Sequence, residues 1–121
     1  SVPVSKIPQF IAEATLAVNL FMPKARVMSF GHMGDGNMHF NVSQPPGMDK
    51  KKYLDGWNEM NKVVFDVVLR FGGSISAEHG IGRLKKHHMP EIKSLVELQM
   101  MRELKKLFDP KNIMNPGKVL P

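Results

Sequence analysis

The stretch that most constrains this chain is 31–41, with the sequence GHMGDGNMHFN. At its centre, Asp35 and Gly36 are residue types that tolerate the positive φ angles of a type I′ turn, and alternating segments flank them. The sequence therefore predicts a β hairpin with strands over 25–33 and 37–43.

Two histidines of this hairpin are predicted to converge. A turn centred on residues 35 and 36 would place His32 directly opposite His39, with Cβ atoms about 4.5–5.5 Å apart on one face. Glu78 is the best candidate for a third ligand, because two imidazoles and one carboxylate suit a divalent cation such as zinc, manganese or iron. The alternative is a cross-strand pair of histidines in a polar rim without a metal.

Two further residues are candidates for chemistry. His79 follows Glu78 and could act as a general base, because histidine titrates near neutrality; otherwise it is a surface histidine. Asn41 lies on the same predicted face as the two histidines and could form a hydrogen bond with a substrate carboxylate. The alternative is that it only forms hydrogen bonds with polar groups at the rim of the sheet. The other polar candidates have structural explanations: Asp35 belongs to the turn, and a solvent-facing basic loop accounts for His87 and His88.

Apolar residues at helical spacing predict three helices, over about 5–22, 50–71 and 91–108, and the stripe in the second includes Trp57 as a core residue. A short extended piece is predicted over 73–82. The fold class is α+β, an antiparallel sheet with helices packed on one face, like much of a ferredoxin-like unit.

Composition narrows the functional classes. With 121 residues the chain is one domain at most, or a piece of one, and it has no cysteine for disulfides or thiolate metal sites. Its net charge of +6 favours an anionic substrate or an acidic partner. Scattered aromatics argue against nucleic acid. No apolar run is long enough for a membrane span, and a cytoplasmic location is expected, or a mitochondrial one in a eukaryote.

Three motifs together resemble a known family. They are GHMGDGNMHFN over 31–41, SISAEHGIGRLK over 74–85 and LFDPKNIMNPGKVLP over 107–121. In this order they resemble the C-terminal region of FAD-linked oxidases of the vanillyl-alcohol oxidase type. The similar branch contains D-lactate dehydrogenases, glycolate oxidase large subunits and D-2-hydroxyglutarate dehydrogenases.

The resemblance implies that residues 1–108 are part of a cap domain over the substrate side of an FAD held elsewhere. An irregular tail, 109–121, would return toward that FAD-binding domain, with Asn115 and Lys118 on the cofactor side. The FAD-binding domain and the upstream half of the cap are then missing, so we expect the chain alone neither to bind FAD tightly nor to turn over. In the chain alone, the apolar face that should meet the FAD-binding domain would be exposed, and this face would allow a homodimer.

The resemblance also implies roles for site residues. His32, His39 and Glu78 would bind the divalent cation, and Asn41 would contact the substrate, a small 2-hydroxy acid oxidised to a 2-oxo acid. His79 would remove the hydroxyl proton while hydride passes from C2 to the flavin. Two alternatives stay open: a non-flavin metalloenzyme with two histidines and one carboxylate, and a non-catalytic binding module.

Overall fold

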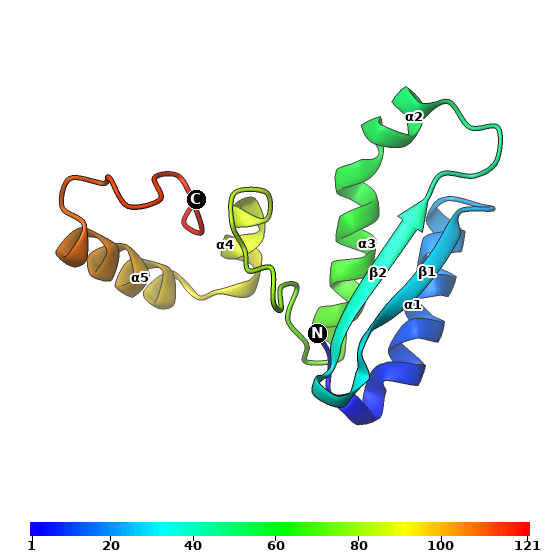
Figure 1. The fold of residues 1–121 in the computed structure, drawn as a ribbon, viewed down its shortest axis with the longest axis horizontal. Coiled ribbons are helices and arrows are strands. Elements are labelled where there is room, and N and C mark those ends of the chain that lie inside the picture. Colours follow the sequence, from blue (N-terminus) through cyan, green and yellow to red (C-terminus); the bar gives the residue numbers. More distant parts are fainter. The chain divides into compact units, whose positions relative to one another are not determined.

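A computed structural model describes all residues, 1–121, and divides them into two compact units, Ser1–Glu78 and His79–Pro121 (Figure 1). The two units are defined by how the residues pack. They do not test the predicted division into a cap segment, 1–108, and a tail, 109–121, which stays a prediction.

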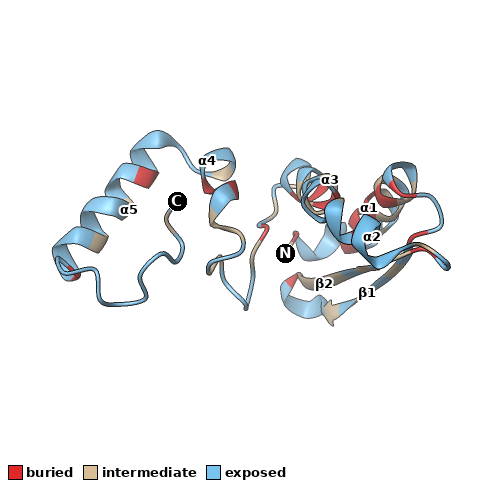
Figure 2. Ribbon diagram, turned by 90° about the horizontal axis from the view of Figure 1, so that it is seen from above, coloured by how far each residue is buried: buried red, intermediate tan, exposed pale blue.

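The first unit is a two-stranded antiparallel sheet covered on one face by helices. Strand β1 spans Arg26–His32 and pairs with β2, Asn37–Ser43. Helices α1, Ile7–Phe21, and α3, Trp57–Arg70, lie side by side over the sheet (Figure 2). The predicted α+β class, with helices on one face of an antiparallel sheet, is confirmed.

The core forms where α1 and α3 meet the inner face of the hairpin. In α1 the buried residues recur at helical spacing and include Phe10, Ala14 and Val18. The Phe10 ring contacts Phe40 of β2, with ring centroids 5.7 Å apart. One aromatic side chain thus joins a helix to the sheet, which fixes the face that the hairpin turns toward solvent.

The predicted helix over 50–71 is broken at Gly56. Its first part is α2, Lys50–Asp55, and its second is α3. Gly56 has φ −89° and ψ 8°, a conformation outside the helical region, so α2 ends there and α3 begins at the next residue. The predicted core position of Trp57 is wrong, since this residue is 46% exposed, whereas Tyr53 is buried and donates a 2.5 Å hydrogen bond to the carbonyl of Val42.

The segment 73–82 contains no strand, contrary to the prediction. The backbone of Ser74 pairs with Ser1 rather than with β1 or β2, so the segment adds nothing to the sheet. Ile75 is nevertheless 5% exposed, which anchors the segment before it reaches Glu78.

The second unit contains two short helical segments and one long helix. A 3-10 turn, η3, spans Lys86–His88, α4 spans Met89–Ile92 and α5 spans Leu95–Phe108. The sequence predicts a single helix from residue 91, but Ser94 and Glu97 form a capping box, and α5 begins at Leu95, four residues after Glu91. After Phe108 the chain forms no further helix or strand.

The capping box generates a prediction for acid unfolding of α5. Hydrogen bonds from the Ser94 backbone, then from Lys93 and the Ser94 hydroxyl, lower the pKa of Glu97 from 4.5 to about 2. A carboxyl whose pKa is lowered stabilises the folded state above its ordinary pKa, and this contribution is lost as pH falls through the lowered value. Helix content measured by far-UV ellipticity is therefore expected to fall between about pH 4.5 and pH 2.

Glu97→Gln should remove that component of the titration, because glutamine keeps a side-chain acceptor but carries no titrating charge. Glu103→Gln, on the same helix outside the box, serves as the control. Asp109, whose pKa is lowered chiefly by the hydrogen bond from Lys105, titrates in both variants and cancels in the comparison. Identical acid profiles for the two variants would contradict the assignment.

Candidate metal and substrate site

The hairpin turn is longer than predicted, and this shifts the register. A type I′ turn needs positive φ at both central residues, but of Asp35 and Gly36 only Gly36 has it, at 76°. Residues Met33–Asp35 form a 3-10 turn, η2, in which Asp35 accepts a hydrogen bond from the Asn37 amide at 3.1 Å. The structural role predicted for Asp35 fits this contact.

The predicted pairing of His32 with His39 is therefore wrong. His32 pairs with Asn37, and His39 pairs with Phe30. The register is displaced by two residues, and because side chains alternate with a period of two, both histidines stay on the same, outer face. They are diagonal neighbours rather than directly opposed residues.

Glu78 lies between the two histidines. Its Oε1 is 3.0 Å from Nε2 of His39, and its Oε2 is 3.9 Å from Nδ1 of His32. The three side chains are partly accessible, with relative exposures of 28% for His39, 43% for Glu78 and 66% for His32. The structure thus brings together the three residues that the sequence predicts as ligands, at an open edge of the sheet.

The His39 ring is held from a second side by Phe30. The two rings stack with centroids 5.0 Å apart and an interplanar angle of 13°. Both residues belong to the outer face of the hairpin, where Met28 and Asn41 form the next cross-strand pair and are exposed. The predicted substrate residue Asn41 therefore shares a face with His39 and is accessible.

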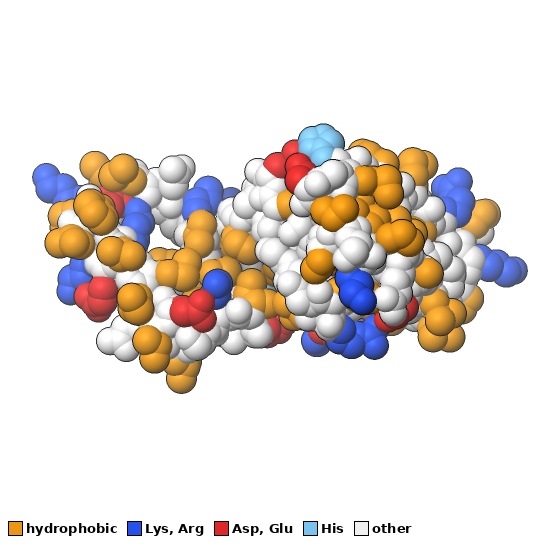
Figure 3. Space-filling model, turned by 90° about the horizontal axis from the view of Figure 1, so that it is seen from below, with side chains coloured by type: hydrophobic (Ala, Val, Ile, Leu, Met, Phe, Trp, Pro, Cys, Tyr) orange, Lys and Arg blue, Asp and Glu red, His pale blue; other side chains and the backbone are white.

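The surface around this end of the hairpin combines histidine and acidic groups. Figure 3 shows a histidine side chain beside acidic side chains at the rim of the first unit, next to apolar side chains. Two imidazoles and one carboxylate suit a divalent cation better than a polyanion.

Comparisons with known proteins agree with the motifs. The sequence matches the family model for FAD linked oxidases, C-terminal domain, over residues 1–119. The chain belongs to this family.

Relatives of this FAD-linked oxidase C-terminal domain include bacterial and plant enzymes. It is 42% identical to a D-2-hydroxyglutarate dehydrogenase of Stutzerimonas stutzeri, over 98% of this chain and 26% of the relative. A protein of the same name from Xanthomonas citri is 39% identical, over 98% of this chain and 25% of the relative. The mitochondrial D-2-hydroxyglutarate dehydrogenase of Arabidopsis thaliana is 43% identical, over 80% of this chain and 16% of the relative.

The chain therefore spans about a quarter of the length of the bacterial relatives that it matches. None of its helices has the length and apolar character needed to cross a membrane.

Three predicted site residues of this C-terminal domain belong to the second unit. His79 directly follows Glu78 and is exposed. Asn115 and Lys118 are exposed in the tail, where Asn115 has φ 48°. Their predicted roles as base and cofactor contacts stay predictions.

His88 differs from its predicted solvent-facing position. It is 7% exposed, and its Nδ1 lies 3.4 Å from Oε2 of Glu91. Burial also lowers the pKa of the neighbouring Lys85. The spacing of His88 and Glu91, three residues apart across a helix start, was the available sequence signal for this pair.

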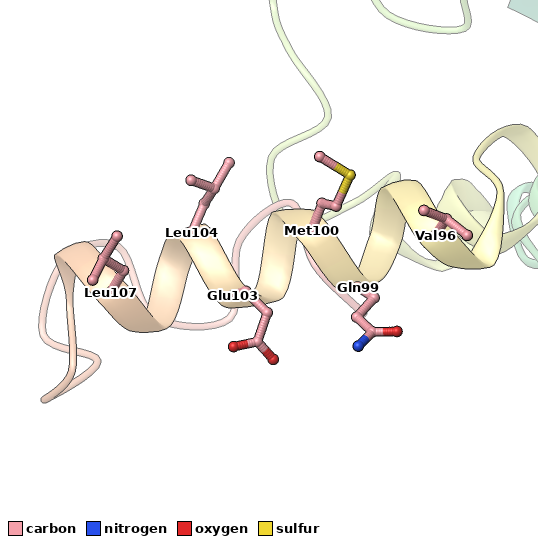
Figure 4. Close-up of a pocket in the computed structure, with 6 residues that line it drawn as sticks. All are labelled: Val96, Gln99, Met100, Glu103, Leu104 and Leu107. Atoms are coloured by element: carbon pink, nitrogen blue, oxygen red, sulfur yellow. The ribbon is translucent and has the colours of Figure 1, made fainter.

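An apolar hollow of about 630 Å³ lies along α5 (Figure 4). Met100 and Leu104 point to one side of the helix in the close-up, and Gln99 and Glu103 point to the other. Val96 and Leu107 complete the lining. Because Glu103 is the single titratable group in this lining, the hollow offers a packing surface rather than a catalytic constellation.

The stack of Phe30 on His39 generates a prediction for this C-terminal domain. In Phe30→Ala the upfield ring-current shift of the His39 ring protons should disappear, because the aromatic face beside the imidazole is removed. The measurement is the proton NMR spectrum of the histidine rings. Met28→Ala, which removes an exposed apolar side chain from the same face, should leave the His39 signals in place. Loss of the shift in both variants would contradict a specific stack.

Proposed function

We propose that the whole protein to which this domain belongs is an FAD-dependent D-2-hydroxy acid dehydrogenase that produces the 2-oxo acid with the help of a divalent cation. The observation that carries the proposal is the position of the Glu78 carboxylate between His39 and His32 on the open face of the hairpin. The names of the relatives support D-2-hydroxyglutarate as the first substrate to test. D-lactate and glycolate are the other acids that the motifs suggest.

The donor set fits a divalent cation. His32 and His39 offer neutral ring nitrogens and Glu78 offers a carboxylate, a combination suited to zinc, manganese or iron. The two carboxylate oxygens of Glu78 lie 3.0 Å from Nε2 of His39 and 3.9 Å from Nδ1 of His32. When bound, such an ion supplies Lewis-acid polarisation of the substrate, and three protein ligands leave positions open for it.

His79 is proposed to take the hydroxyl proton of the substrate. Oxidation of the C2 alcohol breaks the C2–H and O–H bonds and forms the C2=O bond, releasing one hydride equivalent and one proton. A neutral imidazole can accept that proton at physiological pH. FAD, when bound by the rest of the whole protein, supplies the acceptor for the hydride equivalent.

Asn41 is proposed to orient the substrate. Its exposed amide lies on the same outer face as His39 and can donate an N–H to a substrate carboxylate. Asn115 and Lys118, in the exposed tail, are the residues proposed to approach the cofactor. A cationic lysine there suits the negative charge of FAD phosphates.

The activity test uses the full-length protein. His79→Asn is expected to lower kcat with D-2-hydroxyglutarate by about 10²- to 10⁴-fold, the usual contribution of a positioned general base. The FAD absorption spectrum should be unchanged, because the cofactor is held elsewhere. His87→Asn provides a matched control outside the proposed site. Equal rates for wild type and His79→Asn would contradict the proposed base.

The apolar face of α5 is proposed to pack against the remaining three quarters of the whole protein. Met100, Leu104 and Leu107 are 60%, 54% and 73% exposed. Side chains of this kind, adjacent on one helix, mark a contact surface. The relatives are about four times longer than this chain, which supplies a covering partner within the same polypeptide.

The paired substitutions Met100→Glu and Leu104→Glu test this contact in two contexts. In the 121-residue chain they should change the free energy of unfolding by less than about 0.5 kcal/mol, as surface substitutions do. In the whole protein they should destabilise by roughly 2 kcal/mol or more, since charges would be buried without partners. Equal effects in both would contradict the contact. Sedimentation of the 121-residue chain would show whether a second copy, the predicted homodimer, covers the face instead.

A further inference from the structure

We propose that the extended segment Ser1–Val2 positions the Glu78 carboxylate against His39, and that Gly36 and Gly73 are positioning residues because they admit this segment. The inference deepens the proposed function, on which the metal-binding part of its test rests. It concerns only the first unit.

Backbone hydrogen bonds join the segment to two distant parts of the chain. On one side, the Val2 amide donates to the carbonyl of Gly36 at 3.0 Å. On the other side, the terminal amino group of Ser1 donates to the carbonyl of Ser74 at 2.7 Å, and the Ser1 carbonyl accepts from the Ser74 amide at 2.9 Å. The hairpin turn and the segment that leads to Glu78 are therefore connected through two residues.

Gly36 allows the segment to cross directly over the turn. A Cβ atom at this position would lie 2.1 Å from the carbonyl oxygen of Val2, far inside van der Waals contact. The obstructing atom belongs to the backbone, so a side-chain rotation cannot relieve the clash. The Val2 side chain itself is 5% exposed and belongs to the core.

Gly73 allows the same close approach from the other side. A Cβ atom there would lie 2.2 Å from the carbonyl oxygen of Ser1 and 2.9 Å from Cγ1 of Val68. The φ angle of Gly73 lies outside the left-handed region, so the requirement for glycine at this position comes from space.

The two contacts lie close to the candidate ligands along the chain. His39 is in the strand that begins directly after Gly36, and Glu78 follows Ser74 by four residues. Between Ser74 and Glu78, the Ser74 hydroxyl donates a 2.7 Å hydrogen bond to the carbonyl of Ser76, which keeps this short connection ordered. A shift of Ser1–Val2 would therefore change the position of Glu78 relative to His39.

The chain offers matched controls for both glycines. Gly36 and Gly47 have nearly equal φ angles, 76° and 78°, but an added Cβ at Gly47 meets nothing within 4 Å. Gly34 likewise has no atom within 4 Å of an added Cβ and no positive φ, which makes it the control for Gly73.

The experiment measures zinc binding to the 121-residue chain by competition with a chromophoric chelator, together with the NMR signals of the His39 ring without metal. Gly36→Ala and Gly73→Ala are expected to raise the zinc dissociation constant by about 10- to 100-fold, as loss of supporting contacts around metal ligands does. They should also move the metal-free His39 signals. Gly47→Ala and Gly34→Ala should do neither. The proposal would be overturned if Gly36→Ala bound zinc and shifted the His39 signals no differently from Gly47→Ala, and Gly73→Ala no differently from Gly34→Ala.

A second comparison covers the case in which an added methyl group unfolds the chain. Deletion of Ser1–Val2 and Val2→Ala both remove the buried side chain, but only the deletion removes the backbone bridge. The deletion should weaken zinc binding and shift the His39 signals more than Val2→Ala does; equal effects would overturn the bridge. If the wild-type chain binds no zinc, the metal site of the proposed function is refuted. The His39 signals recorded without metal then still test whether Ser1–Val2 positions Glu78.

Discussion

The conformation of Gly36 determines which residues of the hairpin face one another. Its left-handed backbone closes the turn begun by Met33–Asp35, and the resulting register pairs His32 with Asn37 and His39 with Phe30. The inner face then packs on α1 and α3 through residues such as Phe40. The opposite face is left to His32 and His39, so the same turn fixes both the core and the candidate site.

The positions of the histidines on one face were predictable although their pairing was not. Alternation along a strand depends only on a period of two, and a longer turn that displaces the register by two residues preserves it. The pairing depended on whether Asp35 would adopt positive φ. Its side chain instead accepts the Asn37 amide and stabilises a longer turn.

Other differences arise from interactions that span the chain. The periodicity of 50–71 predicted helix correctly, but one glycine, Gly56, ends α2 and begins α3. The extended piece after Gly73 pairs with Ser1, a partner 73 residues away that no local pattern indicates. The sequence nevertheless predicts Glu78 as a third ligand, because a carboxylate complements two imidazoles around a divalent cation whatever path the backbone takes, and this role stays a prediction.

The two units differ in how completely they bury apolar groups. The first has a continuous core from Val2 to Val68, whereas in the second Leu98 and Met89 are buried and most large apolar side chains of α5 are exposed. The small core of the second unit leaves most of the apolar side chains of α5 in contact with solvent. This fits a domain that spans about a quarter of the bacterial relatives that it matches.

The most direct test of the account is a crystal structure of the chain grown with zinc, with anomalous diffraction recorded at the zinc absorption edge. The account predicts one zinc ion at about 2.0–2.2 Å from a ring nitrogen of His32, a ring nitrogen of His39 and a carboxylate oxygen of Glu78. A crystal with no anomalous peak at these residues, or with zinc bound only elsewhere, as at His87 and His88, would contradict it.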